Sequence, residues 1–288
     1  MHKISVVTPS YNQAQFLETT ILSVLNQGYP NLEYIIIDGG STDGSIDIIK
    51  KYENQLTYWI SEKDNGQAEA INKGFNIATG DILSWLNSDD YYKENTLNTI
   101  NNIINPENSE LVFGNVIMYD QNKNIYTEKN IQNIYNKYNL SIYDYIIQPS
   151  SFWTRKAWEQ TGELNSDFNY VFDWEWYIRA KKAGINFIFQ NHYFSTYRIH
   201  DNHKSSFGGK KRNSEIETIL KCYSEKKYSD AFQFIKQNEL TLSKIYSITQ
   251  KLTRNRFSFG LFKILYPHYF LGLTNSEILQ LYSNSEYY

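Results

Sequence analysis

The sequence has a single cysteine, Cys222, among its 288 residues. An internal disulfide therefore cannot form, and a cysteine-rich metal site is excluded. A lone thiol is typical of a protein in a reducing compartment. The chain also lacks an uncharged apolar run of the ~20 residues that a membrane-spanning helix needs. The nearest candidate, Phe257 to Leu273, is interrupted by Lys263, Pro267 and His268.

Two nucleotide-binding motifs are absent as well. No G-x-G-x-x-G follows the first predicted strand, and no G-x-x-x-x-G-K-[ST] occurs in the chain, which disfavours a dinucleotide-binding fold and a phosphate-loop NTPase. The formal net charge is only −3, so we expect no nucleic acid partner. Because the N-terminus has no signal-peptide layout, we expect a cytoplasmic protein.

The charge is unevenly distributed along the chain. Residues 206–288 hold 12 Lys and Arg against 7 Asp and Glu, whereas residues 1–205 hold 16 against 24. This basic tail is predicted to be a helical cap that completes an acceptor site or mediates a homodimer. The alternative is a peripheral contact with the inner face of an anionic membrane, through Arg254, Arg256 and Lys263 among the apolar side chains of residues 257–266. We favour the cap because surface helices commonly show this pattern.

The first hundred residues alternate between strand and helix patterns. Predicted strands are Ile4–Thr8, Tyr34–Ile37, Leu56–Ile60 and Ile82–Leu86, and predicted helices are Gln13–Gln27, Ser45–Tyr52 and Gly66–Ala78. This order predicts an α/β fold with a mostly parallel central sheet flanked by helices. Residues 106–205 are less regular, and the pattern from about Asn213 is helical. We therefore expect one domain over 1–205 and a helical C-terminal extension over 206–288.

Polar residues follow each of the four predicted strands. In such sheets ligands bind beyond the carboxyl ends of the strands, so these four loops should meet at one edge. The loops are Thr8 to Asn12, Asp38 to Ser41, Ser61 to Gly66, and Asn87 to Asp90. Four polar loops at one edge predict a built site rather than four separate caps.

The fourth loop contains the adjacent carboxylates Asp89 and Asp90, directly after an apolar run. Such a pair is costly unless positive charge lies beside it. Carboxylate oxygens suit Mg²⁺ or Mn²⁺, which usually keep several waters and bind substrate phosphates. The alternative is that Asp90 caps the next helix.

Two further segments have a functional and a structural interpretation. Asp38 could accept a hydrogen bond from a nucleobase or a ribose hydroxyl, or it could organise an Asx-type turn. Asp64 and Asn65 could point at a ligand, or they could begin an ordinary capped helix. Within that helix Ala70 and Gly74 lie on one face, which allows close packing on the sheet.

The second half of the chain contains a candidate general base, Asp173, and two basic residues, Arg198 and His200, that could bind a ligand. Asp173 begins a predicted helix and could be a general base or merely an N-cap. Arg198 and His200 alternate along a predicted strand and so face the same side. They could hold a diphosphate or a metal, although a lone histidine is more often structural.

Taken together and in order, these segments resemble the inverting family-two glycosyltransferases with a GT-A fold. The resemblance covers roughly residues 3–205, and each motif is weak alone, whereas their order and spacing are specific. The motifs are Val7-Thr8-Pro9-Ser10-Tyr11-Asn12, Asp38-Gly39-Gly40-Ser41-Thr42-Asp43-Gly44, Asp64 to Gly74, Gly80-Asp81 with Asn87-Ser88-Asp89-Asp90, Gln148-Pro149-Ser150, Asp173, and Arg198 with His200.

The resemblance implies a role for each matching residue. Residues 1–105 would be the nucleotide-binding half and 106–205 the acceptor half. The nucleoside pocket would comprise Thr8, Pro9, Tyr11, Asp38, Asp64, Asn65 and, near the ribose, Asp89. Asp90 would bind a Mn²⁺ or Mg²⁺ ion that bridges the donor phosphates, with His200 beside the metal or the diphosphate. Asp173 would be the base, and Arg198, Gln148, Glu175 and Trp174 would line the diphosphate or acceptor region.

The chain departs from the family at two positions. Asn87 stands where the family often has an acid, and Phe172 stands where a Glu usually precedes the base. Asp173 is therefore the favoured base and Glu175 the alternative. Trp174, Trp176 and Tyr177 could stack on sugars or form core. One base without a carboxylate nucleophile implies a single displacement with inversion at the anomeric carbon.

The leading hypothesis is an inverting glycosyltransferase that uses a nucleotide-sugar donor. The resemblance implies a UDP-sugar, and an acceptor hydroxyl on a surface glycan or a lipid-linked precursor. A sugar-1-phosphate nucleotidyltransferase is disfavoured because Ser10 to Gln13 is not the Gly-rich basic loop of that class. A catalytically lapsed nucleotide-sugar or glycan-binding module is the non-enzymatic alternative.

Overall fold

The computed structural model describes residues 1–201, 203–204, 208–253 and 258–285. The chain divides into two compact units, one formed by Met1–Asn133 with Ile146–His203 and the other by Ile134–Tyr145 with Lys204–Tyr288. The sequence predicts a domain boundary after residue 205, with residues 134–145 inside the first domain. The structure instead groups 134–145 with the C-terminal helices.

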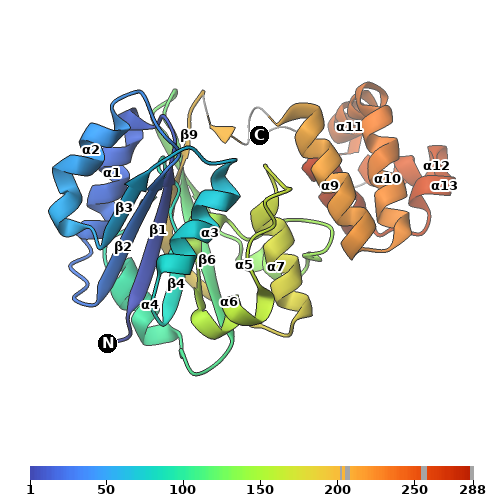
Figure 1. The fold of residues 1–288 in the computed structure, drawn as a ribbon. Helices are drawn as coiled ribbons and strands as arrows, with labels where there is room; N and C mark the ends of the chain where they lie inside the picture. The colour runs from blue at the N-terminus through green and yellow to red at the C-terminus, as the bar shows by residue number, and fades with distance from the viewer. Residues whose placement is uncertain (202, 205–207, 254–257, 286–288) are drawn as a thin grey trace. The chain divides into compact units, whose positions relative to one another are not determined.

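A mixed β-sheet forms the centre of the first unit (Figure 1). Its order among the described residues is β3-β2-β1-β4-β8-β6-β9-β5, and β7 pairs with β6. The strands are β1 (Ile4–Ser10), β2 (Leu32–Asp38), β3 (Tyr58–Ser61), β4 (Ile82–Trp85), β5 (Tyr91–Tyr92), β6 (Glu110–Asp120), β7 (Ile125–Lys129), β8 (Ser151–Thr154) and β9 (Asn186–Ile199).

Strands β3, β2, β1 and β4 run parallel, as expected. Strand β8 then runs antiparallel to both β4 and β6, whereas β9 is parallel to β6 and antiparallel to β5. The whole sheet is therefore mixed rather than mostly parallel. The fold is nevertheless the α/β architecture with a central sheet flanked by helices that the sequence predicts.

Helices cover both faces of the parallel strands (Figure 1). The helical segments of this unit are α1 (Ala14–Leu25), α2 (Ser45–Tyr52), η1 (Glu53–Gln55), α3 (Gln67–Ile77), α4 (Thr96–Ile103), α5 (Gln132–Tyr135, whose second half belongs to the other unit), η2 (Gln148–Ser150), α6 (Arg155–Thr161) and α7 (Phe172–Lys182). One core packs apolar side chains of α1, α2 and α4 against alternate residues of β1 and β2, such as Val6 and Ile36.

The opposite face of β1 is covered by α3. Any Cβ atom added at Gly74 would collide with the Val7 side chain, and Ala70, one turn earlier, is buried. The prediction that these two small residues allow close packing on the sheet is confirmed. This close approach fixes the start of α3 beside the strand ends that carry the polar loops.

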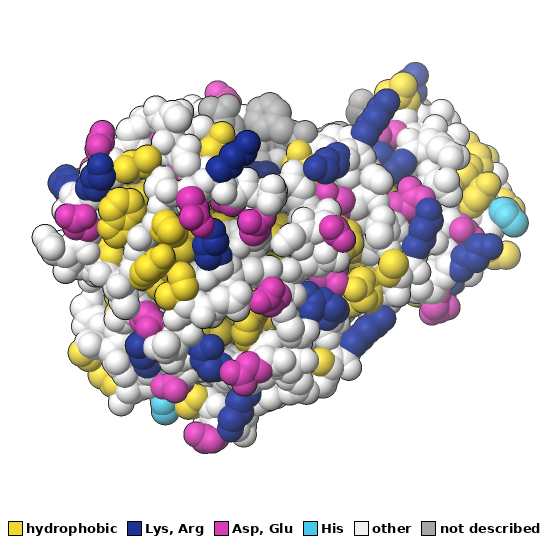
Figure 2. Space-filling model, in the orientation of Figure 1, with side chains coloured by type: hydrophobic (Ala, Val, Ile, Leu, Met, Phe, Trp, Pro, Cys, Tyr) yellow, Lys and Arg dark blue, Asp and Glu magenta, His cyan; other side chains and the backbone are white. Residues whose placement is uncertain are grey.

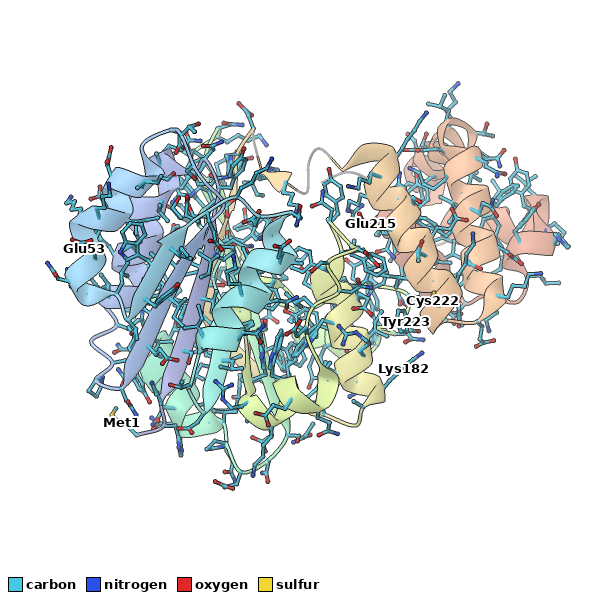
Figure 3. The ribbon with its side chains drawn as sticks, viewed as in Figure 1. Met1, Glu53, Lys182, Glu215, Cys222 and Tyr223 are labelled. Carbon is cyan, nitrogen blue, oxygen red and sulfur yellow. The ribbon has the colours of Figure 1, made fainter. Side chains whose placement is uncertain are left out.

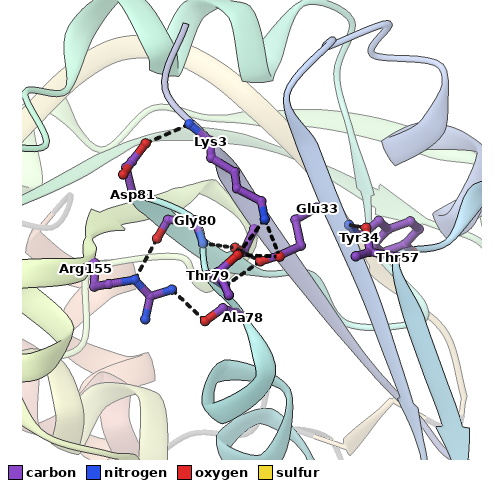
Figure 4. Close-up of polar contacts among 10 residues, drawn as sticks. Lys3, Glu33, Tyr34, Thr57, Ala78, Thr79, Gly80, Asp81 and Arg155 are labelled. Atoms are coloured by element: carbon purple, nitrogen blue, oxygen red, sulfur yellow. Dashed lines mark hydrogen bonds and ion pairs between the residues drawn. The ribbon is translucent and has the colours of Figure 1, made fainter.

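A polar network holds together the amino edge of the sheet (Figure 4). The buried Glu33 carboxylate accepts hydrogen bonds from the Ser5 and Thr79 hydroxyls and from the Thr79 backbone N–H, and it pairs with Lys3 at 2.6 Å. Arg155 donates to the Gly80 and Ala78 carbonyls, each at 2.8 Å. Burial alone would raise the pKa of Glu33, but these hydrogen bonds outweigh it and lower the pKa to about 2.

Glu33 should therefore give the fold an acid-sensitive contribution. Because the pKa of Glu33 in the folded state lies below its ordinary value of 4.5, the contribution is complete above about pH 4.5 and is lost as the pH falls towards 2. At ~1.4 kcal/mol per pKa unit it amounts to at most about 3.5 kcal/mol. We expect the free energy of unfolding, measured with urea, to fall more between pH 5 and pH 3 for the wild type than for Glu33→Gln.

The matched control is Glu53→Gln, because Glu53 is exposed on η1 (Figure 3). Its unfolding free energy should follow the wild-type pH dependence. Parallel curves for the wild type and Glu33→Gln would show that Glu33 is not the source of the effect.

Charged side chains are interspersed over the face of the molecule in Figure 2. Several form surface ion pairs of the first unit, such as Lys51 with Glu18 and Lys156 with Glu107. Exposed pairs of this kind contribute little to stability. The visible face thus presents no broad field of one sign.

The second unit is helical. Its further helices are α9 (Gly209–Tyr223), α10 (Lys226–Gln237), α11 (Glu239–Thr253), α12 (Ser258–Leu265), α13 (Pro267–Phe270) and α14 (Asn275–Ser285). Side chains of α14 hold residues 134–145: the Gln280 Oε1 accepts from the Asn139 N–H at 3.1 Å, and the Asn284 Nδ2 donates to the Ile142 carbonyl at 2.7 Å. Cys222 is exposed on α9 (Figure 3).

The predicted membrane contact is only partly described. Arg254, Arg256 and Phe257 lie outside the described residues, whereas Lys263 is on α12, beside the exposed Ile264 and Leu265. Among the helices of the described ranges, none has the length and apolar character to cross a membrane.

Candidate functional site

The polar loops meet at the carboxyl edge of the parallel strands. Ser10 at the end of β1 pairs in register with Asp38 of β2, and Asp38 pairs with Ser61 of β3. On the other side of β1, the Leu86 N–H donates to the Val7 carbonyl at 2.9 Å and continues β4. Strands β2 and β4 thus flank β1, and this reversal of strand order is where open α/β sheets form ligand crevices.

Asp38 is fully buried and its carboxylate is strongly hydrogen-bonded. It accepts from the backbone N–H groups of Gly40 (3.1 Å) and Ser41 (2.9 Å) and from the hydroxyls of Ser41 and Ser61, both at 2.6 Å. The Asx-type turn that the sequence left open is therefore present. A contact between Asp38 and the nucleoside stays a prediction.

Asp64 lies against this turn. A Cβ atom on Gly39 would come within 2.8 Å of the Asp64 Oδ2, so a larger residue at this position would have to displace this carboxylate. Burial raises the pKa of Asp64, and the hydrogen bond from the Gly66 N–H opposes that effect. The two acidic loops are consequently adjacent at the edge.

The other predicted nucleoside residues differ in accessibility. Tyr11 is 61% exposed and can offer its ring to a ligand. The Thr8 hydroxyl is buried 3.1 Å from the Tyr34 hydroxyl, and Pro9 is buried too. The exposed Asn65 donates to Glu69 at 2.8 Å. Tyr11, Asp38 and Asp64 are therefore together at the edge, whereas the Thr8 side chain is turned into the core.

Asp90 is only 1% exposed. Its Oδ1 accepts from the Arg198 backbone N–H at 2.9 Å, and its carbonyl accepts from the Thr20 hydroxyl at 2.7 Å. Burial, and then the neighbouring Asp89, raise the pKa of Asp90 well above its usual range. The alternative role as a helix cap is wrong, because β5 follows directly and the next helix has Asn95 as its N-cap.

Asp89 connects the loop to β9. Its Oδ2 lies 3.1 Å from the Nε2 of the buried His200, and its carbonyl accepts from the Arg198 Nε at 2.9 Å. Arg198 and His200 thus approach the acidic pair from the same side, as their alternation predicts. The Arg198 guanidinium also lies over the rings of Phe16, Tyr91 and Tyr119.

The start of α7 lies beside the end of β4, since the rings of Phe172 and Trp85 are 6.2 Å apart. Asp173 is half-buried in the first helical turn, and its Oδ1 accepts from the Trp174 N–H at 2.8 Å. The N-cap of α7 is Val171, so the alternative of Asp173 as an N-cap is wrong.

The neighbours of Asp173 are built into the core. Glu175 is buried and contacts the Arg179 Nε at 2.8 and 3.0 Å. Trp174, Trp176 and Tyr177 are buried, so of the two alternatives for these rings, sugar stacking or core, the structure supports core. Asp173 is the better-placed carboxylate of this turn.

Two glutamines, one on η2 and one on α3, donate hydrogen bonds to the end of β4 and to the loop that follows it. Gln148 is buried on η2 and its Nε2 donates to the Trp85 carbonyl at 2.8 Å, at the end of β4. Gln67, the first residue of α3, donates to the Asn87 Oδ1 at 2.7 Å. Sequence reasoning missed Gln67, although it lies within the Asp64 to Gly74 motif, and also missed Phe16 and Thr20, for which no motif gave a signal.

The carboxylates of Asp89 and Asp90 could bind a divalent ion whose remaining ligands come from the substrate. No group of three or more His, Cys, Asp or Glu side chains with metal-binding geometry occurs in the described part of the chain. Mg²⁺-type sites, however, commonly use one or two carboxylates and take their other ligands from substrate phosphates and water. Asp89 and Asp90 provide carboxylates of that kind, and His200 lies beside Asp89.

Comparison with known proteins identifies the first half of the chain. A model for glycosyl transferase family 2 matches residues 5–159. The glycosyltransferase GlyG of Streptococcus pneumoniae is 35% identical over 121 residues, which is 41% of this chain and 40% of GlyG. TuaG of Bacillus subtilis, a putative teichuronic acid biosynthesis glycosyltransferase, is 41% identical over 97 residues, or 33% of this chain and 38% of TuaG. The matches thus span well under half the length of these relatives.

Solved structures extend the likeness to nearly the whole chain. Residues 1–349 of TarS from S. aureus, in complex with UDP-GlcNAc, match with a TM-score of 0.60 and 17% identity over 98% of this chain and 79% of that TarS fragment. The mannosyltransferase PcManGT of Pyrobaculum calidifontis, in complex with GDP-Man and Mn²⁺, has a TM-score of 0.63 and 15% identity over 99% of this chain and 87% of its own. At these identities the likeness shows the fold alone.

Proposed function

The chain belongs to glycosyl transferase family 2, and we propose that it transfers a sugar from a nucleotide-diphosphate donor to an acceptor hydroxyl with inversion. The observation that carries this proposal is that Asp38, Asp64, Asp89 and Asp90 follow neighbouring parallel strands at the same carboxyl edge of the sheet. A UDP-sugar is the expected donor. The expected acceptor is a surface glycan or a lipid-linked precursor, reached in the cytoplasm or at the inner face of the cell membrane.

In this proposal the two acidic regions have different tasks. Tyr11, Asp38 and Asp64 bind the nucleoside, with the Tyr11 ring against the base. Asp90 and His200, with Asp89 beside them, would hold Mn²⁺ or Mg²⁺. The bound ion would neutralise the charge that develops on the departing diphosphate. The structurally similar mannosyltransferase was solved in complex with GDP-Man and Mn²⁺, which supports a donor site that includes a divalent ion.

Asp173 is proposed to accept the proton of the acceptor hydroxyl. The acceptor oxygen then bonds to the anomeric carbon while the bond to the diphosphate oxygen breaks on the opposite face. The contacts of Phe172 with Trp85 and of Gln148 with the Trp85 carbonyl support a fixed position for α7 beside the acidic loop.

Calorimetric titration with UDP, GDP, TDP and CDP, each with Mn²⁺ and with EDTA, tests the donor class. We expect one preferred nucleotide and loss of its binding in EDTA. If none of the four binds to the folded protein, the donor assignment is wrong. Tight binding without turnover of the corresponding nucleotide sugars would favour a lapsed binding module.

A further inference from the structure

A row of side chains crosses three strands of the first unit. Tyr126 of β7 pairs in register with Tyr119 of β6, which pairs with Arg198 of β9. The two tyrosine rings are stacked, with centroids 4.3 Å apart and an interplanar angle of 14°. The Arg198 guanidinium lies 5.7 Å from the centre of the Tyr119 ring. The three side chains therefore share one face of the sheet.

The outer end of this row is open to solvent. Tyr126 is 59% exposed although Tyr119 stacks on it, so one ring face is covered and the other is accessible. Glu128 lies two residues further along β7, and therefore on the same face. It is exposed, and its carboxylate accepts from the Tyr193 hydroxyl at 2.9 Å, which orients it.

The inner end of the row joins the candidate catalytic loop. Arg198 donates from its backbone N–H to the Asp90 carboxylate and from its Nε to the Asp89 carbonyl. A side-chain hydrogen bond also links Tyr91, directly after Asp90, to Tyr126. An extended ligand that starts at the acidic pair could thus continue along the row to Tyr126.

We propose that Tyr126, supported by Tyr119 and accompanied by Glu128, binds a sugar ring of the acceptor at a subsite remote from the reacting hydroxyl. A pyranose ring has an apolar C–H face that fits an open aromatic ring, and equatorial hydroxyls that can donate to a carboxylate. A tyrosine combines an apolar face with a polar end and suits such a ligand. The inference rests on the proposed function, and it makes the acceptor an oligosaccharide rather than a single sugar.

Saturation-transfer NMR and calorimetry with chitotetraose, cellotetraose and maltotetraose test the subsite. We expect the intact wild-type chain to bind at least one of them, and Tyr126→Ala to weaken that binding by about tenfold, the scale of one lost aromatic contact. Glu128→Gln should weaken it less. The matched control is Ile125→Ala: Ile125 is 51% exposed and adjacent in β7, but its side chain points to the opposite face.

Three results would overturn the subsite: no tetrasaccharide binding by the wild type, equal binding by Tyr126→Ala, or equal losses in Tyr126→Ala and Ile125→Ala. A change of oligomeric state in Tyr126→Ala would instead identify the face as a protein interface. Nucleotide titration of the same samples separates the two proposals. Nucleotide binding without tetrasaccharide binding rejects the subsite alone, whereas tetrasaccharide binding without nucleotide binding rejects the transferase.

Discussion

Asp173→Asn is expected to abolish sugar transfer while donor binding stays intact. Asp173 lies in the first turn of α7, and that turn is anchored beside β4 by the contact of Phe172 with Trp85. Asparagine keeps the size and the hydrogen bond to the Trp174 N–H but cannot take a proton. Loss of a general base lowers kcat by roughly 10²- to 10⁴-fold. Initial rates at saturating donor, with calorimetry of donor binding, measure both effects.

Two variants make this test specific. Asp167→Asn changes an exposed aspartate of the preceding loop and should leave kcat unchanged. Glu175→Gln weakens the ion pair with Arg179. It should lower the free energy of unfolding and leave kcat close to the wild-type value. Near-normal turnover by Asp173→Asn would disprove the base assignment, and an equal loss in Asp167→Asn would indicate a loop effect.

The sequence predicted those parts of the fold that depend on short-range patterns. The alternation of strands and helices up to Leu86, and the polar residues after each strand, suffice to predict that Ser10, Asp38 and Ser61 meet. In the structure these three residues pair in register at the carboxyl edge of the parallel strands. The small residues Ala70 and Gly74 likewise indicated where α3 packs.

The remaining features depend on contacts between distant residues. Asp90 is not a cap because β5 pairs with β9, more than a hundred residues later, and a local pattern cannot reveal that pairing. Antiparallel β8 makes the sheet mixed for the same reason. Glu175 and Trp174 looked available on a helix, but the surrounding elements bury them. Whether a polar residue is a ligand or a support is decided by tertiary contacts.

Asp90→Asn is expected to weaken metal-dependent nucleotide binding without lowering the stability of the fold. Asp90 is almost fully buried beside a second carboxylate, and an uncompensated buried charge costs folding free energy. The neutral amide should therefore leave the free energy of unfolding unchanged or increase it. It should also remove the main ligand for the divalent ion, so that the Kd of the preferred nucleotide diphosphate in Mn²⁺ rises by about 100-fold, or ~3 kcal/mol.

The comparison that decides this assignment uses wild type, Asp90→Asn and Asp47→Asn, which alters an exposed aspartate of α2. Asp47→Asn should bind like the wild type in Mn²⁺, and Asp90→Asn should bind like the wild type in EDTA. If Asp90→Asn retained metal-dependent binding, the ion would be held by Asp89 and His200 instead, and the buried carboxylate would only support Arg198. If Asp90→Asn lost stability, the hydrogen bond from the Arg198 N–H would outweigh the cost of the buried charge.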